Sequence, residues 1–181
     1  MPHKIVITGA PASGKSEFIE RLKEEPEFAD FVFLEEVARK LIEEDPSYRS
    51  RRAEFHHEVY RRQTAQEDRL TDRSFITDRG TVDAFAFHPE TAGHYHTTIE
   101  DEYRRYDAVI LLGSTAAMGA PFYRQDNVRT ESPEEVMALE EATINVWKGH
   151  RNFVEIKAET DPEIKYRRLR ETLLEIIRAP K

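Results

Sequence analysis

The sequence contains no cysteine among its 181 residues, which excludes disulfide bonds, thiolate metal ligands and a catalytic thiol. It has no apolar run near the roughly 18 residues that a membrane-spanning helix needs. The apolar stretch that follows Lys4 is also too short for the core of a secretion signal. We therefore expect a cytoplasmic protein that does not span a membrane.

A net basic charge is also missing. The 27 lysines and arginines are outnumbered by 35 aspartates and glutamates, so the net charge is −8. Basic and acidic residues are interleaved, as at Glu17/Arg21 and Arg168/Glu171, which is typical of solvated helix faces. Because nucleic-acid binders usually carry a basic stripe, we expect a small-molecule partner and no nucleic acid. The composition leaves the oligomeric state open.

Short apolar segments alternate with helical patterns along the whole chain, and no internal repeat or flexible linker interrupts them. The expected strands cover residues 4–8, 31–34, 75–77, 107–112 and 152–156. The longest expected helices cover residues 52–72, 132–147 and 161–177. This alternation predicts one α/β domain over residues 1–181, a three-layer fold with a five-stranded parallel sheet. We expect the first strand at the centre of the sheet and the second at an edge.

Capping signals mark the last two helices. Ser132 is a good cap, and Glu135 completes a capping box. Asp161 caps the final helix, with Pro162 in its first turn. The residues of this helix expected to face the core are Ile164, Leu169, Leu173 and Ile177.

The pattern G-x-x-x-x-G-K-[ST] follows the first expected strand and opens the first helix, the context that makes this motif a phosphate-binding loop. Its backbone N–H groups and the helix N-terminus bind phosphate oxygens. Lys15 is expected to reach the β- and γ-phosphates, and the Ser16 hydroxyl to ligate Mg²⁺. The residues expected to hold MgATP are Gly9, Ala10, Pro11, Ala12, Ser13, Gly14, Lys15 and Ser16.

Charged residues follow two further strands, where the functional side chains of a parallel sheet gather. The second strand ends in Glu35-Glu36, and either carboxylate is a candidate to accept a proton from an acceptor hydroxyl. The alternative is an ordinary acidic residue in the first turn of a helix. The third strand leads into Asp78-Arg79-Gly80. We expect Asp78 to hold Mg²⁺ directly or through water, with a helix cap as the alternative.

Residues 113–131 follow the most apolar strand and are expected to form a loop, whose polar part at about 114–131 is expected to serve as a lid. Arg124 and Arg129 within it are candidates to close over the transferring phosphoryl group. The alternative is two solvated loop arginines. His88, His94 and His96 also lie in a polar stretch, without an obvious fourth metal ligand, and we expect loop histidines there.

These motifs together resemble a family of predicted P-loop ATPase and kinase domains, which are AAA-domain-like. The likeness rests on the P-loop, on Glu36-Val37-Ala38-Arg39, on the stretch from Thr77 to Phe87 and on residues 123–131. The family is similar to nicotinamide riboside kinases and, more distantly, to thymidylate and deoxynucleoside kinases. The resemblance implies that Glu36 activates the acceptor, that Asp78 and Arg79 work with Mg²⁺ and phosphate, and that residues 123–131 form an arginine-bearing lid. It does not specify the acceptor.

Two functions remain in competition on this evidence, and a third, a nucleotide-binding module without catalysis, is disfavoured by Asp78 and Glu36. The first is a kinase that transfers the γ-phosphate of MgATP to a small molecule, nucleoside-like or another metabolite. The second is an ATPase or switch module regulated by a protein partner. A GTPase of the switch type is disfavoured because the third strand ends in Asp-Arg-Gly and the chain contains no Asn-Lys-x-Asp. The choice between ATP and GTP stays open.

Overall fold

The computed structural model describes residues 1–119, 122–123 and 131–180. Its parallel strands form one sheet in the order β2-β3-β1-β4-β5. The strands are β1 (Lys4–Thr8), β2 (Val32–Leu34), β3 (Phe75–Asp78), β4 (Ala108–Leu112) and β5 (Phe153–Ile156). The expected parallel sheet is confirmed, with the first strand central and the second at an edge.

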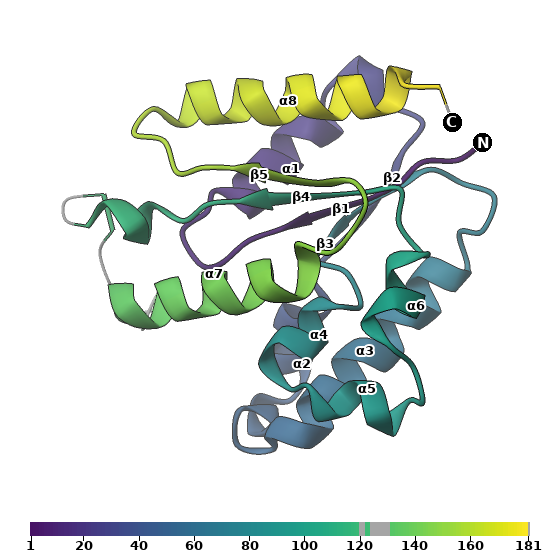
Figure 1. Cartoon of the computed structure of the whole chain (residues 1–181), viewed down its shortest axis with the longest axis vertical. Coiled ribbons are helices and arrows are strands. Elements are labelled where there is room, and N and C mark those ends of the chain that lie inside the picture. Colours follow the sequence, from purple (N-terminus) through teal and green to yellow (C-terminus); the bar gives the residue numbers. More distant parts are fainter. Residues whose placement is uncertain (120–121, 124–130, 181) are drawn as a thin grey trace.

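Helices cover both faces of the sheet (Figure 1). One face carries α1 (Lys15–Lys23) and α8 (Pro162–Arg178), and the other carries α3 (Arg52–Asp68), α4 (Asp83–Phe87) and α7 (Pro133–Trp147). The shorter elements are α2 (Val37–Glu44), α5 (Glu90–His94), α6 (Ile99–Tyr103) and the 3₁₀ turns Pro26–Phe28, Pro46–Ser50 and Thr115–Met118. No helix in the described part of the chain is long and apolar enough to cross a membrane.

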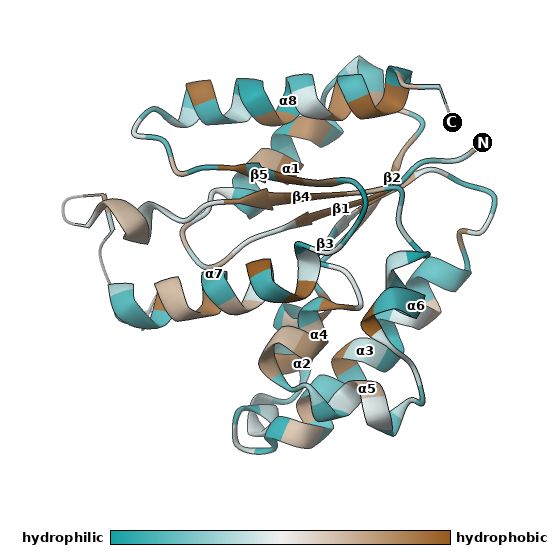
Figure 2. Ribbon diagram, viewed as in Figure 1, coloured by the Kyte–Doolittle hydropathy of each residue, from teal (hydrophilic) through white to brown (hydrophobic). Residues whose placement is uncertain are grey.

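The alternation of side chains along β1 explains why the strands are apolar throughout. Ile5 and Ile7 pack against the layer of α1 and α8, whereas Val6 packs against the opposite layer with Trp147 of α7. All four side chains are fully buried, because a strand covered on both faces has no solvated side. Figure 2 shows this pattern as brown strands between helices whose outer sides are teal.

The capping signals in the sequence predicted the beginnings of α7 and α8 correctly. Ser132 and Glu135 form the expected capping box of α7, and the Asp161 side chain caps α8 through the N–H of Glu163. The expected helix over residues 52–72 was too long. It ends at Asp68, after which the chain turns and Leu70 packs on the core.

Two expectations about side chains and loops were wrong. Ile164 does not face the core and is 37% exposed. The buried stripe of α8 instead runs through Lys165, Tyr166, Leu169 and Leu173, so Ile164 lies outside it. The segment after β4 is also not purely a loop, because Thr115–Met118 forms a 3₁₀ turn capped by the side chain of Ser114.

Candidate functional site

The loop between β1 and α1 packs directly on the end of β4. Gly9 has φ 156°, and a Cβ atom there would stand 2.5 Å from the carbonyl oxygen of Leu112, so the loop can approach β4 only with glycine at this position. Gly14 is the N-cap of α1, and no side chain caps this helix. Its first turn therefore offers N–H groups and a positive dipole to an anion, as a phosphate chain requires.

Four charged side chains meet beside this loop because the parallel register aligns the carboxyl ends of β1, β3 and β2. Lys15 forms a buried ion pair with Asp78, and its Nζ lies 3.9 Å from Oε2 of Glu36. The Nε of Arg79 donates to Oε1 of Glu36 at 3.0 Å. The structure thus brings together four of the residues that the sequence indicated separately.

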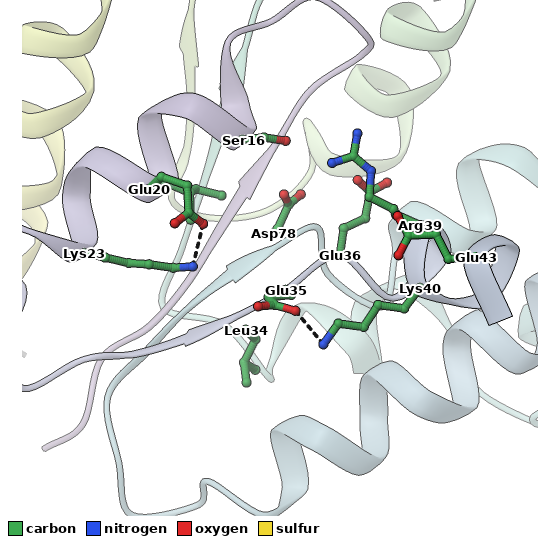
Figure 3. A pocket seen from close by; sticks show the side chains of 11 residues that line it. Ser16, Glu20, Lys23, Leu34, Glu35, Glu36, Arg39, Lys40, Glu43 and Asp78 are labelled. Atoms are coloured by element: carbon green, nitrogen blue, oxygen red, sulfur yellow. Dashed lines mark hydrogen bonds and ion pairs between the residues drawn. The ribbon is translucent and has the colours of Figure 1, made fainter. Parts of the chain in front are cut away.

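Glu35 and Glu36 have different surroundings, although both follow β2. Glu35 is exposed and forms an ion pair with Lys40 at 2.5 Å (Figure 3). Glu36 is half-buried between Lys15 and Arg79. Burial raises the pKa of Glu36, but the charges of Arg79 and Lys15 outweigh burial and lower it to about 2. Both carboxylates line the cavity that Ser16 and Asp78 border, but Glu36 is the one that meets Lys15 and Arg79, and it is ionised at neutral pH.

Ser16 and Asp78 border one cavity of about 260 Å³, which Glu36 also lines (Figure 3). The alternative role of Asp78 as a helix cap is not seen, since the N-cap of α4 is Val82 and no side chain caps it. The pKa of Asp78 is raised, chiefly by burial. The charge of Lys15 lowers this pKa, and the charge of Glu36 raises it further. A hydroxyl and a carboxylate suit Mg²⁺, which completes its shell with water and phosphate oxygens. The residues present therefore fit the expected ion.

Arg79 occupies a constrained turn after β3. Its φ is 66°, in the left-handed region that residues other than glycine rarely adopt. Gly80 follows, and a Cβ atom there would lie 3.0 Å from the Trp147 ring. The Nη1 atom of Arg79 is buried without a hydrogen bond, 3.5 Å from Oδ1 of Asp83. Burial lowers the pKa of Arg79, but the nearby carboxylates, Glu36 first, raise it overall. The site thus holds a cation with an unused donor.

Asp83 holds this arrangement together, and the sequence did not single it out. Its buried carboxylate accepts hydrogen bonds from Thr8 Oγ1, from the N–H of Gly80 at 2.8 Å and from Trp147 Nε1 at 3.2 Å. The contacts join the end of β1, the turn after β3 and helix α7. No spacing in the sequence marks such a residue, because its partners come from three distant segments.

A second hollow, of about 160 Å³, lies next to Glu36 and Arg79 between α2, α3 and α4. Gln63 borders it, but its amide already donates to Glu67 at 2.7 Å and to Thr77 at 2.9 Å. The remaining wall is largely apolar and aromatic, and we call this space the acceptor hollow, after the role that we propose for it below. Its apolar lining includes Val37, Ala38, Phe55, Val59, Ala84 and Phe87.

Histidines from α3 and from the segment around α5 stack on one another near this hollow. The ring centroids of His57 and His94 are 3.8 Å apart, and those of His56 and His88 are 5.6 Å apart. Among the described residues, no three His, Asp or Glu side chains are placed to hold a metal ion. Burial, and then neighbouring positive charge, lowers the pKa of His56 to about 4; burial and the other histidines also lower the pKa of His57.

The stack is expected to make the fold sensitive to acid. The pKa of His56 is about 4 in the folded chain and about 6.5 when unperturbed. Its contribution to stability is therefore fully present above pH 6.5 and is lost as the pH falls toward 4. Urea unfolding at several pH values should show that His56→Asn reduces this loss. The exposed His96→Asn is the control, and equal pH dependence in the parent and both variants would contradict the assignment.

The two arginines expected in the lid, Arg124 and Arg129, lie outside the described residues. The described residues that flank this segment are in contact, since the hydroxyl of Tyr123 donates to the carbonyl of Glu131 at 2.8 Å. The lid and its arginines therefore stay predictions.

Comparison with known proteins agrees with this geometry. Residues 4–163 match the model of the AAA domain family, whereas no curated protein matches the sequence. One structure of similar fold is that of deoxyadenosine kinase from M. mycoides with the products dCMP and dCDP, with a TM-score of 0.66. The two sequences are 15% identical, and the match covers 95% of this chain and 99% of that chain. A second structure of that enzyme, with bound dATP, is similar at a TM-score of 0.65 and the same identity and coverage.

At 15% identity these structures show a shared fold and no more. The family match, however, covers most of the chain and includes the phosphate-binding loop and the Asp-Arg-Gly turn. The chain thus belongs to the AAA domain family, as a P-loop domain for nucleoside triphosphates with the fold of the deoxynucleoside kinases.

Proposed function

We propose that this protein is a kinase that transfers the γ-phosphoryl group of ATP to a hydroxyl of a small, uncharged molecule. The observation that carries the proposal is the position of Glu36. Its side chain lines both the cavity that contains Ser16 and Asp78 and the acceptor hollow. A carboxylate at the junction of a phosphate site and an apolar hollow is suited to orient a hydroxyl toward the phosphate.

Each charged side chain has a use in this reaction. The ionised Glu36 accepts the hydrogen bond of the acceptor hydroxyl and later its proton. The guanidinium of Arg79, which lines the same hollow and donates to Glu36, keeps this carboxylate in place and adds positive charge beside the reacting groups. Phosphoryl transfer needs alignment more than a strong base, so a carboxylate with a pKa of about 2 suffices.

Lys15 is expected to change partners when the nucleotide binds. In the structure it is paired with Asp78, and a triphosphate in the loop attracts it to the β- and γ-phosphates. That move frees Asp78, which together with the Ser16 hydroxyl would hold Mg²⁺ and so neutralise phosphate charge. It also removes one of the cations that lower the pKa of Glu36, and so makes this carboxylate a better base. Arg124 and Arg129 would add positive charge from the lid.

The lining of the acceptor hollow limits the acceptor. The polar side chains that line it are Glu36, Arg79, His56, Gln63 and Asp83. Gln63 and Asp83 already make hydrogen bonds within the fold, and the His56 ring stacks on that of His88. Aromatic and aliphatic walls favour an apolar or ring-bearing body. An uncharged nucleoside-like alcohol meets these conditions. Two structures of similar fold are of a deoxyadenosine kinase, so nucleosides come first in any screen.

The test is ATP turnover with and without candidate acceptors. A thermal-shift screen of nucleosides, vitamins and sugars, run with a nonhydrolysable ATP analogue, identifies ligands that stabilise the fold. Each hit is then incubated with MgATP, and ADP and the phosphorylated product are quantified. We expect ADP formation to depend on the acceptor. ADP formation that no acceptor stimulates would overturn the proposal and favour the ATPase regulated by a protein partner.

Filling the acceptor hollow should separate acceptor binding from nucleotide binding. Ala38→Phe places a ring in the hollow and is expected to raise KM for the acceptor by about tenfold or more, a cost above about 1.4 kcal/mol. ATP affinity should not change. Ala65→Phe on the exposed side of α3 is the matched control. Equal KM values in both variants would place the acceptor elsewhere.

A further inference from the structure

A buried ammonium group lies outside the charged cluster described above. Lys165 on α8 is 2% exposed. Its Nζ donates to the carbonyl oxygen of Ser13 at 2.7 Å and to that of Gly113. Burial lowers the pKa of Lys165 to about 8, although Glu140 of α7 opposes this shift. Burying a cation costs free energy unless hydrogen bonds or opposite charges compensate it. Here the compensating carbonyl groups belong to the phosphate-binding loop and to the end of β4.

Two hydroxyl groups after β4 make matching contacts with the same loop. Ser114 Oγ donates to the carbonyl of Pro11 at 2.6 Å. The backbone N–H and the Oγ1 of Thr115 donate to the carbonyl of Ala12 at 3.1 and 3.2 Å. Glu140 holds this segment in turn, because its carboxylate accepts from the N–H of Ser114 at 2.6 Å. Lys165, Ser114 and Thr115 therefore form a brace around the loop.

The brace engages three consecutive carbonyl groups, those of Pro11, Ala12 and Ser13. A carbonyl that accepts a hydrogen bond from α8 or from the segment after β4 points toward that donor. It is then not turned into the loop, where its partial negative charge would repel a phosphate. The N–H groups of the loop are left facing the phosphates, as a phosphate nest requires.

We propose that Lys165 is a positioning residue for phosphate binding, which together with Ser114 holds the loop in its phosphate-binding conformation before the nucleotide arrives. The ammonium contacts loop carbonyls, so it acts through the backbone of the loop and does not touch the phosphate. The inference rests on phosphate binding at residues 9–16. It holds equally for a kinase and for an ATPase, so its failure and that of the proposed transfer reaction are distinguishable.

The test measures binding of ATP and of inorganic triphosphate, each with Mg²⁺, by titration calorimetry well below the melting temperature. Lys165→Met is expected to weaken both ligands by the same factor, about tenfold or more, since hydrogen bonds to a charged group are lost. Lys165→Arg, which keeps the charge and several donors, should recover part of the affinity. Arg168→Met, an exposed position on the same helix, is the control and should bind like the parent.

A second variant keeps the test decisive if Lys165→Met does not fold. Ser114→Ala removes the hydroxyl that holds the Pro11 carbonyl and should weaken both ligands by about three- to tenfold. Ser50→Ala, an exposed serine in a distant turn, is its control. Folded variants of Lys165 or Ser114 that melt earlier but bind both ligands like the parent would overturn the proposal and leave the brace a purely structural role. A loss confined to ATP would also overturn it, because the effect would then lie at the base and not at the phosphates.

Discussion

Replacing Lys15 with alanine is expected to lower nucleotide turnover by about a hundredfold or more, the cost of one preorganised donor to charge that develops in the transition state. The side chain is 7% exposed and lies between Asp78 and Glu36. Its loss removes the cation that neutralises the transferring phosphoryl group, and no other residue of the loop carries a positive charge. ADP formation under single-turnover conditions is the measurement.

The same substitution is expected to cost stability, because Asp78 loses its buried partner. The double variant Lys15→Ala/Asp78→Asn separates the two effects, since it removes both charges of the pair. We expect it to regain stability in urea unfolding without regaining turnover. Lys148→Ala, at the exposed end of α7 and bonded to Asn145, should turn over ATP like the parent. Normal turnover in Lys15→Ala would show that the loop is not the catalytic site.

Glu36→Gln is expected to lower phosphoryl transfer by about 10²- to 10⁴-fold, the range for loss of one positioned acid–base group. The amide keeps the shape of the side chain and removes its capacity to accept a proton. Nucleotide affinity should stay the same or rise slightly, because one negative charge near Lys15 is gone. Rapid-quench measurement of transfer alongside nucleotide affinity distinguishes these quantities.

Two neighbouring carboxylates serve as controls for Glu36. Glu35→Gln changes the exposed residue paired with Lys40 and should leave transfer unaffected. Asp78→Asn should instead weaken Mg²⁺-dependent nucleotide binding, because the ion requires the charge. If Glu36→Gln and Asp78→Asn lowered nucleotide affinity equally, the roles assigned to the two carboxylates would be wrong.

The parts of this protein that could be predicted from sequence are local ones. The strand, loop and helix around Lys15 are contiguous, so their order along the chain already defines the phosphate site. The capping box at Ser132 and the cap at Asp161 involve neighbours within three residues. The alternation of strands and helices was sufficient for a parallel sheet, and right-handed crossovers limit the possible strand orders.

The choice between Glu35 and Glu36 depended on tertiary contacts. The side chains of adjacent residues point in different directions from the backbone. The position of Arg79, in its left-handed turn, decides which of the two carboxylates forms an ion pair with it. The acceptor hollow is likewise formed by side chains from α2, α3 and α4. The sequence of α3 places Phe55 and Val59 near one face, but nothing in it indicates which other elements close a hollow over that face.

The sequence by itself determined that the chain folds as a P-loop α/β domain and where its phosphate site lies, because those features are encoded in contiguous residues. Only the tertiary structure decided how the site is supported. Asp83 joins three segments through its carboxylate, and Lys165 lies 152 positions from the carbonyl of Ser13 that it holds. A buried charge of this kind is placed by the partners that the fold brings to it. The periodicity of α8 therefore predicted an apolar residue facing the core, Ile164, where the fold instead directs the ammonium of Lys165.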